Sequence, residues 1–122
     1  MEGANGIYLG KGKVFVCGFA DKKLGKGSVY EYDLESNLIS TILPALGHLD
    51  GLKMHKDKLI VSDWGGDYNH GKLWEIDLLT KKATILSDNK DLKSPSDFEI
   101  YENILLVPCI DTGEILEFKW LE

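Results

Sequence analysis

Short runs of β-branched, aliphatic and aromatic residues fill the chain, and turns rich in Gly, Lys, Asp and Asn separate them, which predicts β-strands. Apolar positions do not recur at helical spacing over any length, so we predict no helix. The runs fall into three groups. The predicted strands are residues 7–9, 14–19, 29–34 and 38–43 in the first group, 52–55, 59–63, 73–77 and 83–87 in the second, and 98–101, 104–108 and 115–120 in the third.

The three groups are copies of one repeat. Asn5-Gly6-Ile7 recurs as Asp50-Gly51-Leu52 and as Ser96-Asp97-Phe98, at offsets of 45 and 46 residues, and the strands that follow recur at the same offsets. A period in the forties with several short strands per unit is typical of β-propeller blades. We therefore predict an all-β fold in which residues 1–122 form one propeller segment. Its blades are residues 5–45, 50–90 and 96–120, and the last blade lacks its outer strand.

Three blades do not close a ring, because propellers typically have about four to eight. The flanking blades would expose large apolar faces, which soluble monomers seldom tolerate. Two explanations are open. Two copies of the chain form a homodimer that closes a six-bladed ring with two-fold symmetry, or the chain is half of a longer protein whose missing N-terminal blades complete the ring.

Composition narrows the classes of partner. The formal net charge is −6 and no Lys/Arg-rich run is present, so we expect no nucleic-acid partner. The N-terminus lacks a basic segment followed by an apolar run, and no stretch approaches the roughly 20 apolar residues of a membrane span. We therefore expect a soluble protein without a membrane partner, and the compartment stays open. Cys17 and Cys109 are predicted to be buried free thiols rather than a disulfide.

One face of the predicted propeller collects the polar candidates. Adjacent strands of a blade are antiparallel, so the start of each innermost strand and the loops after each second strand lie at the same end. Asn5, Asp50 and Asp97 stand at these strand starts, around the expected channel mouth. Converging oxygen ligands suit a divalent cation such as Ca²⁺, Mg²⁺, Mn²⁺ or Zn²⁺. The alternative is that these residues cap tight turns, which Asn and Asp do well.

The loops at the same end, residues 18–27 and 64–71, supply further candidates. Asp63 ends a second strand at the mouth, and Asp63 or Asp97 is placed to act as a general base. The alternative for Asp63 is that it stabilises its own loop. We expect four other side chains to line a ligand site at the mouth: His48, Trp64, Tyr68 and His70.

These motifs carry a family resemblance. Asn5-Gly6-Ile7, Asp50-Gly51-Leu52 and residues 58–64 and 72–77 resemble the gluconolactonase/regucalcin (senescence marker protein) family of six-bladed propellers, with NHL-repeat propellers as a neighbouring possibility. The resemblance implies one divalent cation in the channel with Asn5 and Asp50 as ligands. The family's third protein ligand, a Glu of the first blade, has no counterpart here. Asp97 takes that place by our inference from the repeat.

The resemblance implies metal-dependent hydrolysis of a small lactone or ester, in which the cation polarises the carbonyl and lowers the pKa of a bound water. The alternative is a non-catalytic propeller module that binds a small ligand or a protein on its mouth face. Whether the chain is an enzyme stays open at this point.

Overall fold

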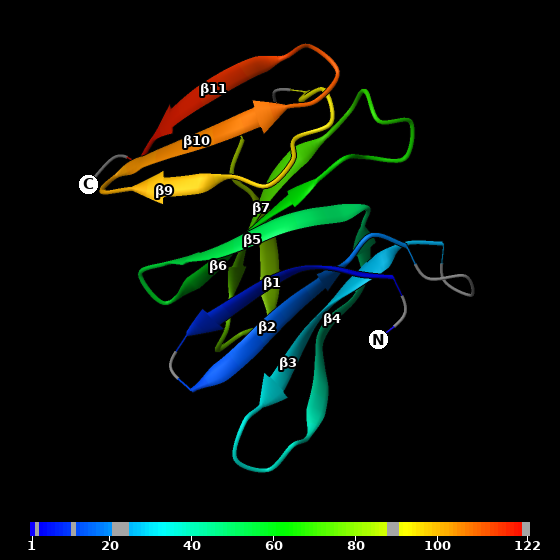
Figure 1. The fold of residues 1–122 in the computed structure, drawn as a ribbon, viewed down its shortest axis with the longest axis vertical. Helices are drawn as coiled ribbons and strands as arrows, with labels where there is room; N and C mark the ends of the chain where they lie inside the picture. The colour runs from blue at the N-terminus through cyan, green and yellow to red at the C-terminus, as the bar shows by residue number, and fades with distance from the viewer. Residues whose placement is uncertain (2, 11, 21–24, 88–90, 121–122) are drawn as a thin grey trace.

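A computed structural model describes residues 1, 3–10, 12–20, 25–87 and 91–120 of the chain. These residues form three antiparallel sheets (Figure 1). Sheet 1 contains β1 (Ala4–Gly10), β2 (Lys13–Gly18), β3 (Gly27–Asp33) and β4 (Ile39–Gly47). Sheet 2 contains β5 (Leu49–His55), β6 (Lys58–Asp63), β7 (Lys72–Asp77) and β8 (Lys82–Ile85). Sheet 3 contains β9 (Glu99–Tyr101), β10 (Ile104–Cys109) and β11 (Glu114–Lys119).

Each sheet is a simple meander in which neighbours in sequence pair with each other. The first strands β1, β5 and β9 lie next to one another, so the sheets are arranged like consecutive blades around a shared inner edge (Figure 1). The prediction of an all-β fold built from propeller-type blades is confirmed. Sheet 3 has three strands among the described residues. The end of the predicted second blade, at residues 88–90, lies outside the described residues.

Three strands extend furthest beyond their predicted bounds: β1 begins at Ala4 rather than residue 7, β5 begins at Leu49 rather than residue 52, and β4 continues to Gly47 rather than ending at residue 43. The pairing of β3 with β4 is irregular at two places, between Gly27 and Val29 and between Val29 and Tyr30. Because of these β-bulges, β4 continues through Pro44 and Gly47 still pairs with Gly27. The sequence alone does not predict them.

The core has two layers, one between each pair of consecutive sheets. We call the face of a sheet that packs on the preceding sheet its front face, and the face that packs on the next sheet its back face. The back face of sheet 1, with Phe15 and Val29, packs on the front face of sheet 2, with Leu59 and Val61. The second layer joins the back face of sheet 2 to the front face of sheet 3 in the same way; its buried members are Ile60, Leu73, Leu92, Phe98, Leu105, Val107 and Cys109.

The inner strands approach closely, and glycine makes this possible. A Cβ on Gly6 would lie 2.2 Å from the carbonyl oxygen of Asp50 in the next sheet, and a Cβ on Gly51 would lie 2.9 Å from the Cα of Asp97. Both distances are shorter than real Cβ contacts, so only glycine fits without a shift of the backbone. The repeated Gly at the second motif position is therefore a packing requirement between sheets.

A side chain from the second strand of sheet 1 and one from the second strand of sheet 2 tie these close contacts together, and we call each of them the latch. The Cys17 thiol donates to the carbonyl oxygen of Asp50 (3.2 Å), and the Ser62 hydroxyl donates to the carbonyl oxygen of Ser96 (2.9 Å). The Ser62 oxygen also accepts the N–H of Gly51 (2.9 Å), which a bulge between Leu49 and Leu52 removes from the regular ladder. Cys17 and Ser62 occupy the same repeat position.

Both cysteines are buried free thiols, as predicted. Burial raises the pKa of Cys17 to about 12, so the thiol stays protonated and keeps its hydrogen to donate. Among the described residues, no helix is long and apolar enough to cross a bilayer.

Candidate functional site

The starts of the inner strands enclose a small hollow at the mouth end of the fold. Its volume is about 220 Å³, and its lining consists of Asn5, Gly6, Ile7, Asp50, Lys53 and Asp97. The three predicted cation ligands are therefore brought together in one cavity, although they are more than 40 residues apart in sequence. The bulges at the starts of β1 and β5 turn the side chains of residues 5 and 50 out of the regular alternation of the strands.

The hollow is electrostatically unbalanced. Burial raises the pKa of Asp50, the hydrogen bond from Trp64 lowers it, and the negative charge of Asp97 raises it further. The nearby ammonium of Lys53 lies 3.7 Å from a carboxylate oxygen of Glu99. The folded chain thus holds two carboxylates close together, and the net effect on Asp50 disfavours its charged form.

Each ligand candidate has a donor oxygen left for a cation. The Asn5 side-chain nitrogen donates to the carbonyl of Leu49 (3.1 Å), which leaves the amide oxygen available. Asp50 accepts the Trp64 indole N–H on Oδ2 (2.9 Å), which leaves Oδ1. Among the described residues, the Asp97 carboxylate accepts no hydrogen bond. One amide and two carboxylates form an oxygen donor set of the kind that hard divalent cations prefer.

The donor set is small. Within the described ranges, no three His, Cys, Asp or Glu side chains gather closely enough to hold a metal ion. A cation in the hollow would therefore rely on the Asn5 amide and on water to fill its coordination shell. The residues fit a weak, hydrated site rather than a closed structural one.

The register of the third sheet corrects the predicted equivalence of Asp97. The latch acceptors are the carbonyls of Asp50 and Ser96, so Ser96 is the counterpart of Asp50 and of Asn5. Asp97 lies one residue later, at the position of Gly6 and Gly51. Its carboxylate reaches the hollow because it packs against Gly51, where a Cβ would meet Asp97 Oδ1 at 2.8 Å.

Asp63 is placed differently from the other acidic candidates. It is 3% exposed, and its carboxylate accepts three hydrogen bonds: from the N–H groups of His48 (3.0 Å) and Gly65 (2.8 Å) and from the Trp74 indole (2.9 Å). A carboxylate held by three protein donors favours the alternative role, in which Asp63 fixes the loop after β6. This loop begins at Trp64, so Asp63 indirectly positions the aromatic side of the mouth.

Aromatic rings gather beside the hollow, and we call this group the aromatic cluster: Phe19, His48, Trp64 and Tyr68. Trp64 contacts Phe19 edge-on at 5.2 Å and Tyr68 at 5.4 Å, and His48 contacts Phe19 at 5.3 Å. Edge-to-face contacts at these distances stabilise such a group beyond its buried area. Three of the four predicted mouth residues therefore meet, and the Trp64–Asp50 hydrogen bond joins the cluster to the hollow.

Sequence reasoning missed Phe19, which bridges the other three rings. The signal was present, since Phe19 directly follows the same second strand that precedes Trp64 in the next repeat.

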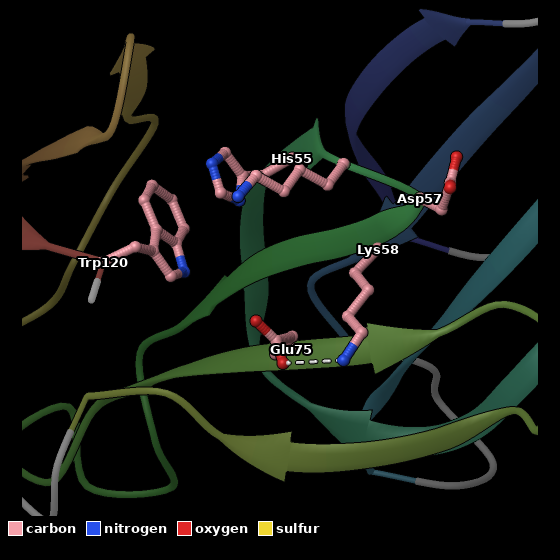
Figure 2. A pocket seen from close by; sticks show the side chains of 6 residues that line it. His55, Asp57, Lys58, Glu75 and Trp120 are labelled. Atoms are coloured by element: carbon pink, nitrogen blue, oxygen red, sulfur yellow. Dashed lines mark hydrogen bonds and ion pairs between the residues drawn. The ribbon is translucent and has the colours of Figure 1, made fainter. Parts of the chain in front are cut away.

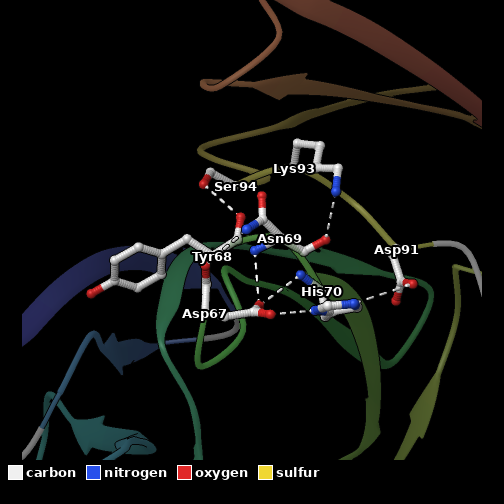
Figure 3. A network of polar contacts seen from close by, with 7 residues as sticks. All are labelled: Asp67, Tyr68, Asn69, His70, Asp91, Lys93 and Ser94. Atoms are coloured by element: carbon white, nitrogen blue, oxygen red, sulfur yellow. Dashed lines mark hydrogen bonds and ion pairs between the residues drawn. The ribbon is translucent and has the colours of Figure 1, made fainter.

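His70, the fourth predicted mouth residue, lies in a separate polar network (Figure 3). Its Nδ1 bonds to Asp67, and its Nε2 lies 3.9 Å from Asp91 Oδ2. Figure 3 shows the Tyr68 ring directed away from His70. The buried Ser94 hydroxyl lies 3.1 Å from the carbonyl oxygen of Tyr68 and 3.2 Å from a carboxylate oxygen of Asp111, and its single proton is shared between these two acceptors. His70 thus belongs to the support of the loop.

A second hollow, of about 290 Å³, lies at the opposite end of the inner strands (Figure 2). There Trp120 stacks on His55, with ring centroids 3.7 Å apart and nearly parallel planes, and Lys58 pairs with Glu75 at 3.4 Å. The stack joins the end of β5 to the residue after β11. It closes that end of the second core layer.

No family model matches the sequence, and no curated protein matches it significantly. Two solved structures are similar in fold. The computationally designed Ika4 protein is 13% identical with a TM-score of 0.68, and the match covers 95% of this chain and 65% of Ika4. A chain in the S. cerevisiae complex of Dbp5 with Nup159, Gle1, IP6 and ADP is 19% identical with a TM-score of 0.57, and that match covers 93% of this chain and 30% of the other. The chain thus spans less than two thirds of the length of either.

Proposed function

We propose that this chain is a binding segment of a β-propeller, whose mouth binds a divalent cation and, beside it, a small ligand. The observation that supports this is the convergence of Asn5, Asp50 and Asp97 on one hollow of about 220 Å³. A carboxylate such as Asp50, whose proton affinity is raised by burial and by a neighbouring carboxylate, is an arrangement that a bound cation relieves. The resemblance to gluconolactonase-type propellers agrees with this assignment for Asn5 and Asp50.

The aromatic cluster forms the apolar side of the proposed ligand site. Trp64 contacts the cluster through its ring and the hollow through its indole N–H, so a molecule bound to the cation would lie against aromatic faces. A cation that keeps open coordination positions binds hydroxyl or carbonyl oxygens well. The ligand class is therefore a small, oxygen-rich molecule with one apolar side, such as a sugar-type lactone.

The experiment is a thermal shift with Ca²⁺, Mg²⁺, Mn²⁺ or Zn²⁺, measured on the parent chain and on Asp50→Asn. A cation at 100 times its Kd stabilises the native state by about 2.7 kcal/mol, which raises the Tm of a chain of this size by roughly 8–13 °C. Asp50→Asn should remove the shift and leave the Tm without cation unchanged or higher, because it removes a carboxylate whose charged form the fold disfavours. Glu35→Gln, an exposed change of equal charge, is the matched control.

The pH dependence gives an independent check. Because the pKa of Asp50 is raised, protons compete with the cation at a higher pH than for an ordinary Asp. The cation shift should therefore be larger at about pH 7.5 than at about pH 4, near the ordinary pKa of Asp. A shift that persists in Asp50→Asn, or one that is equal at both pH values, would contradict the assignment of the hollow.

Hydrolysis at the same cation is the second candidate, because the Asp97 carboxylate lines the hollow without a hydrogen bond from any described residue. A bound cation would supply an activated water, and Asp97 would accept its proton. Lactone opening followed by acid release separates the two functions. Cation binding without turnover supports the binding segment alone. Turnover that Asp97→Asn abolishes, even at cation concentrations high enough to restore its cation shift, establishes the hydrolase.

A further inference from the structure

The front faces of the three sheets carry the same apolar pattern, but among the described residues no sheet packs on the front face of sheet 1. Ile7 in sheet 1 corresponds to Leu52 in sheet 2 and Phe98 in sheet 3. Ile7 is 70% exposed, whereas Leu52 is 1% and Phe98 3% exposed. Leu9 is 64% exposed, while its counterparts Met54 and Ile100 pack against core layers. The front face of sheet 1 consists of Ile7, Leu9, Val14, Val16, Tyr30 and Tyr32. Ile7 and Leu9 on β1 are its exposed part, while Val14, Tyr30 and Tyr32 are half-buried and Val16 is buried.

The covered sheets show what occupies such a face. In both cases it is the back face of a preceding four-stranded sheet, with a glycine at the close approach and a Cys or Ser latch on its second strand. The acceptors of the latch are the carbonyls of Asp50 and Ser96, and the carbonyl of Asn5 has the same repeat position in sheet 1. Sheet 1 thus presents both the apolar surface and the acceptor.

We propose that the front face of sheet 1 is a docking surface for the back face of a further four-stranded antiparallel sheet of the same repeat, which residues 1–122 do not supply. That sheet has glycine where Gly6 and Gly51 stand here. It has Cys, Ser or Thr where Cys17 and Ser62 stand, and its latch donates to the carbonyl of Asn5. Exposed aliphatic patches of this kind mark interaction sites in soluble proteins.

A second copy of the chain does not meet these requirements. The exposed back face in this chain belongs to sheet 3, where Asp97 replaces the glycine and Pro108 replaces the latch. At the positions of Gly6 and Gly51, a Cβ would lie only 2.2–2.9 Å from the backbone of the neighbouring sheet, so the Cβ of Asp97 would clash there. Pro108 has no side-chain donor and cannot make the latch hydrogen bond. This back face carries a hollow of about 340 Å³, lined in part by Leu106, Pro108 and Ile115. Its shape and chemistry therefore differ from the back faces that are covered.

The test adds a second copy of sheet 1 to the chain, so that its back face can cover the original front face. Residues 1–48 are placed before Ala4 of the chain and joined directly to it, because Ala4 and Leu49 share one repeat position. The added copy brings the back face of sheet 1, with its glycine and latch, onto the original front face. Ile7→Cys in the original copy then reports burial through its rate of maleimide labelling. The native thiols give little background, since Cys17 is 0% and Cys109 3% exposed.

We expect labelling at position 7 to slow by about tenfold or more and the Tm to rise by several degrees, with a single unfolding transition. The matched control carries Gly6→Val in the added copy alone. Its Cβ blocks the close approach, while valine suits a strand, so this control should label as fast as the parent chain. Equal labelling of the fusion and the parent chain would overturn the proposal.

The oligomeric state of the unmodified chain tests the alternative occupant. Light scattering should give 13.6 kDa, with rapid labelling of Ile7→Cys at every concentration. A particle of twice this mass in which position 7 is protected would mean that a second copy covers the face. That result would overturn the proposed occupant and establish the homodimer.

Discussion

Ser62→Ala tests whether the latch, rather than apolar burial alone, holds consecutive sheets together. Ser62 is fully buried, and its hydroxyl makes two hydrogen bonds of 2.9 Å. One is accepted from the N–H of Gly51 within sheet 2, and the other is donated to the carbonyl of Ser96 beside sheet 3. The substitution removes one oxygen atom and leaves both backbone groups without this partner.

The structure allows the cost to be worked out. A buried polar group that loses its partner costs about 1–3 kcal/mol, and two such groups are affected. The bulge between Leu49 and Leu52 keeps the Gly51 N–H out of the ladder, so no neighbouring strand replaces the bond. We expect a loss of about 2–4 kcal/mol in the free energy of unfolding. For a chain of this size that loss lowers the Tm by roughly 6–16 °C.

The assay is urea unfolding, followed by the fluorescence of the three tryptophans, with the m-value required to stay constant. Ser40→Ala, on an exposed position of β4, is the matched control and should change the free energy by less than about 0.5 kcal/mol. Ser62→Cys should recover part of the loss, because Cys17 makes the equivalent bond in sheet 1. A loss below about 1 kcal/mol for Ser62→Ala would refute the role of the latch.

Two further predictions concern packing and pH. Gly6→Val should lower the free energy of unfolding in urea by about 1–3 kcal/mol, because its Cβ would lie 2.2 Å from the carbonyl oxygen of Asp50. An unchanged urea midpoint would show that sheets 1 and 2 can move apart without cost. The pKa of Asp77 is lowered by hydrogen bonds from the N–H groups of Thr80 and Leu79. Its contribution is therefore present above the ordinary pKa of 3.8 and is lost as pH falls through the lowered value, so Tm measured between about pH 6 and pH 2 should fall less steeply in Asp77→Asn than in the parent chain.

The sequence predicted the strands well because their determinants are local. The second and third strands of each repeat, such as β6 and β7, alternate apolar side chains that are buried against one neighbouring sheet or the other. Their turns use Asp33 and Asp77, whose carboxylates cap the following backbone N–H groups. Period and turn chemistry were therefore enough to predict three propeller-type sheets.

The candidate site was predicted less completely because its geometry depends on contacts between sheets. The alignment of the repeats already contains the offset of one residue between Asp97 and the position of Asn5 and Asp50, and the latch acceptors confirm that Ser96 holds that position. His70 bonds to Asp67 and lies apart from the Tyr68 ring, and Tyr68 itself adopts a positive φ of 63°. Neither feature has a signature in hydrophobic periodicity.

Comparison of the three repeats separates the residues that the contact between sheets requires from those that it does not require. Contact between sheets requires the glycine, the latch and a backbone carbonyl at the position of Asp50, but it does not require an acidic side chain there. Ser96 shows this, since it offers the same carbonyl without a carboxylate. The Asp50 carboxylate accepts the Trp64 indole N–H on one oxygen, a bond that a neutral amide oxygen could also accept. Its negative charge, which the fold disfavours and which lies beside a second carboxylate, is therefore not explained by contact between sheets. Binding of a cation is the simplest role that would make this arrangement favourable, which is why Asp50→Asn separates function from stability.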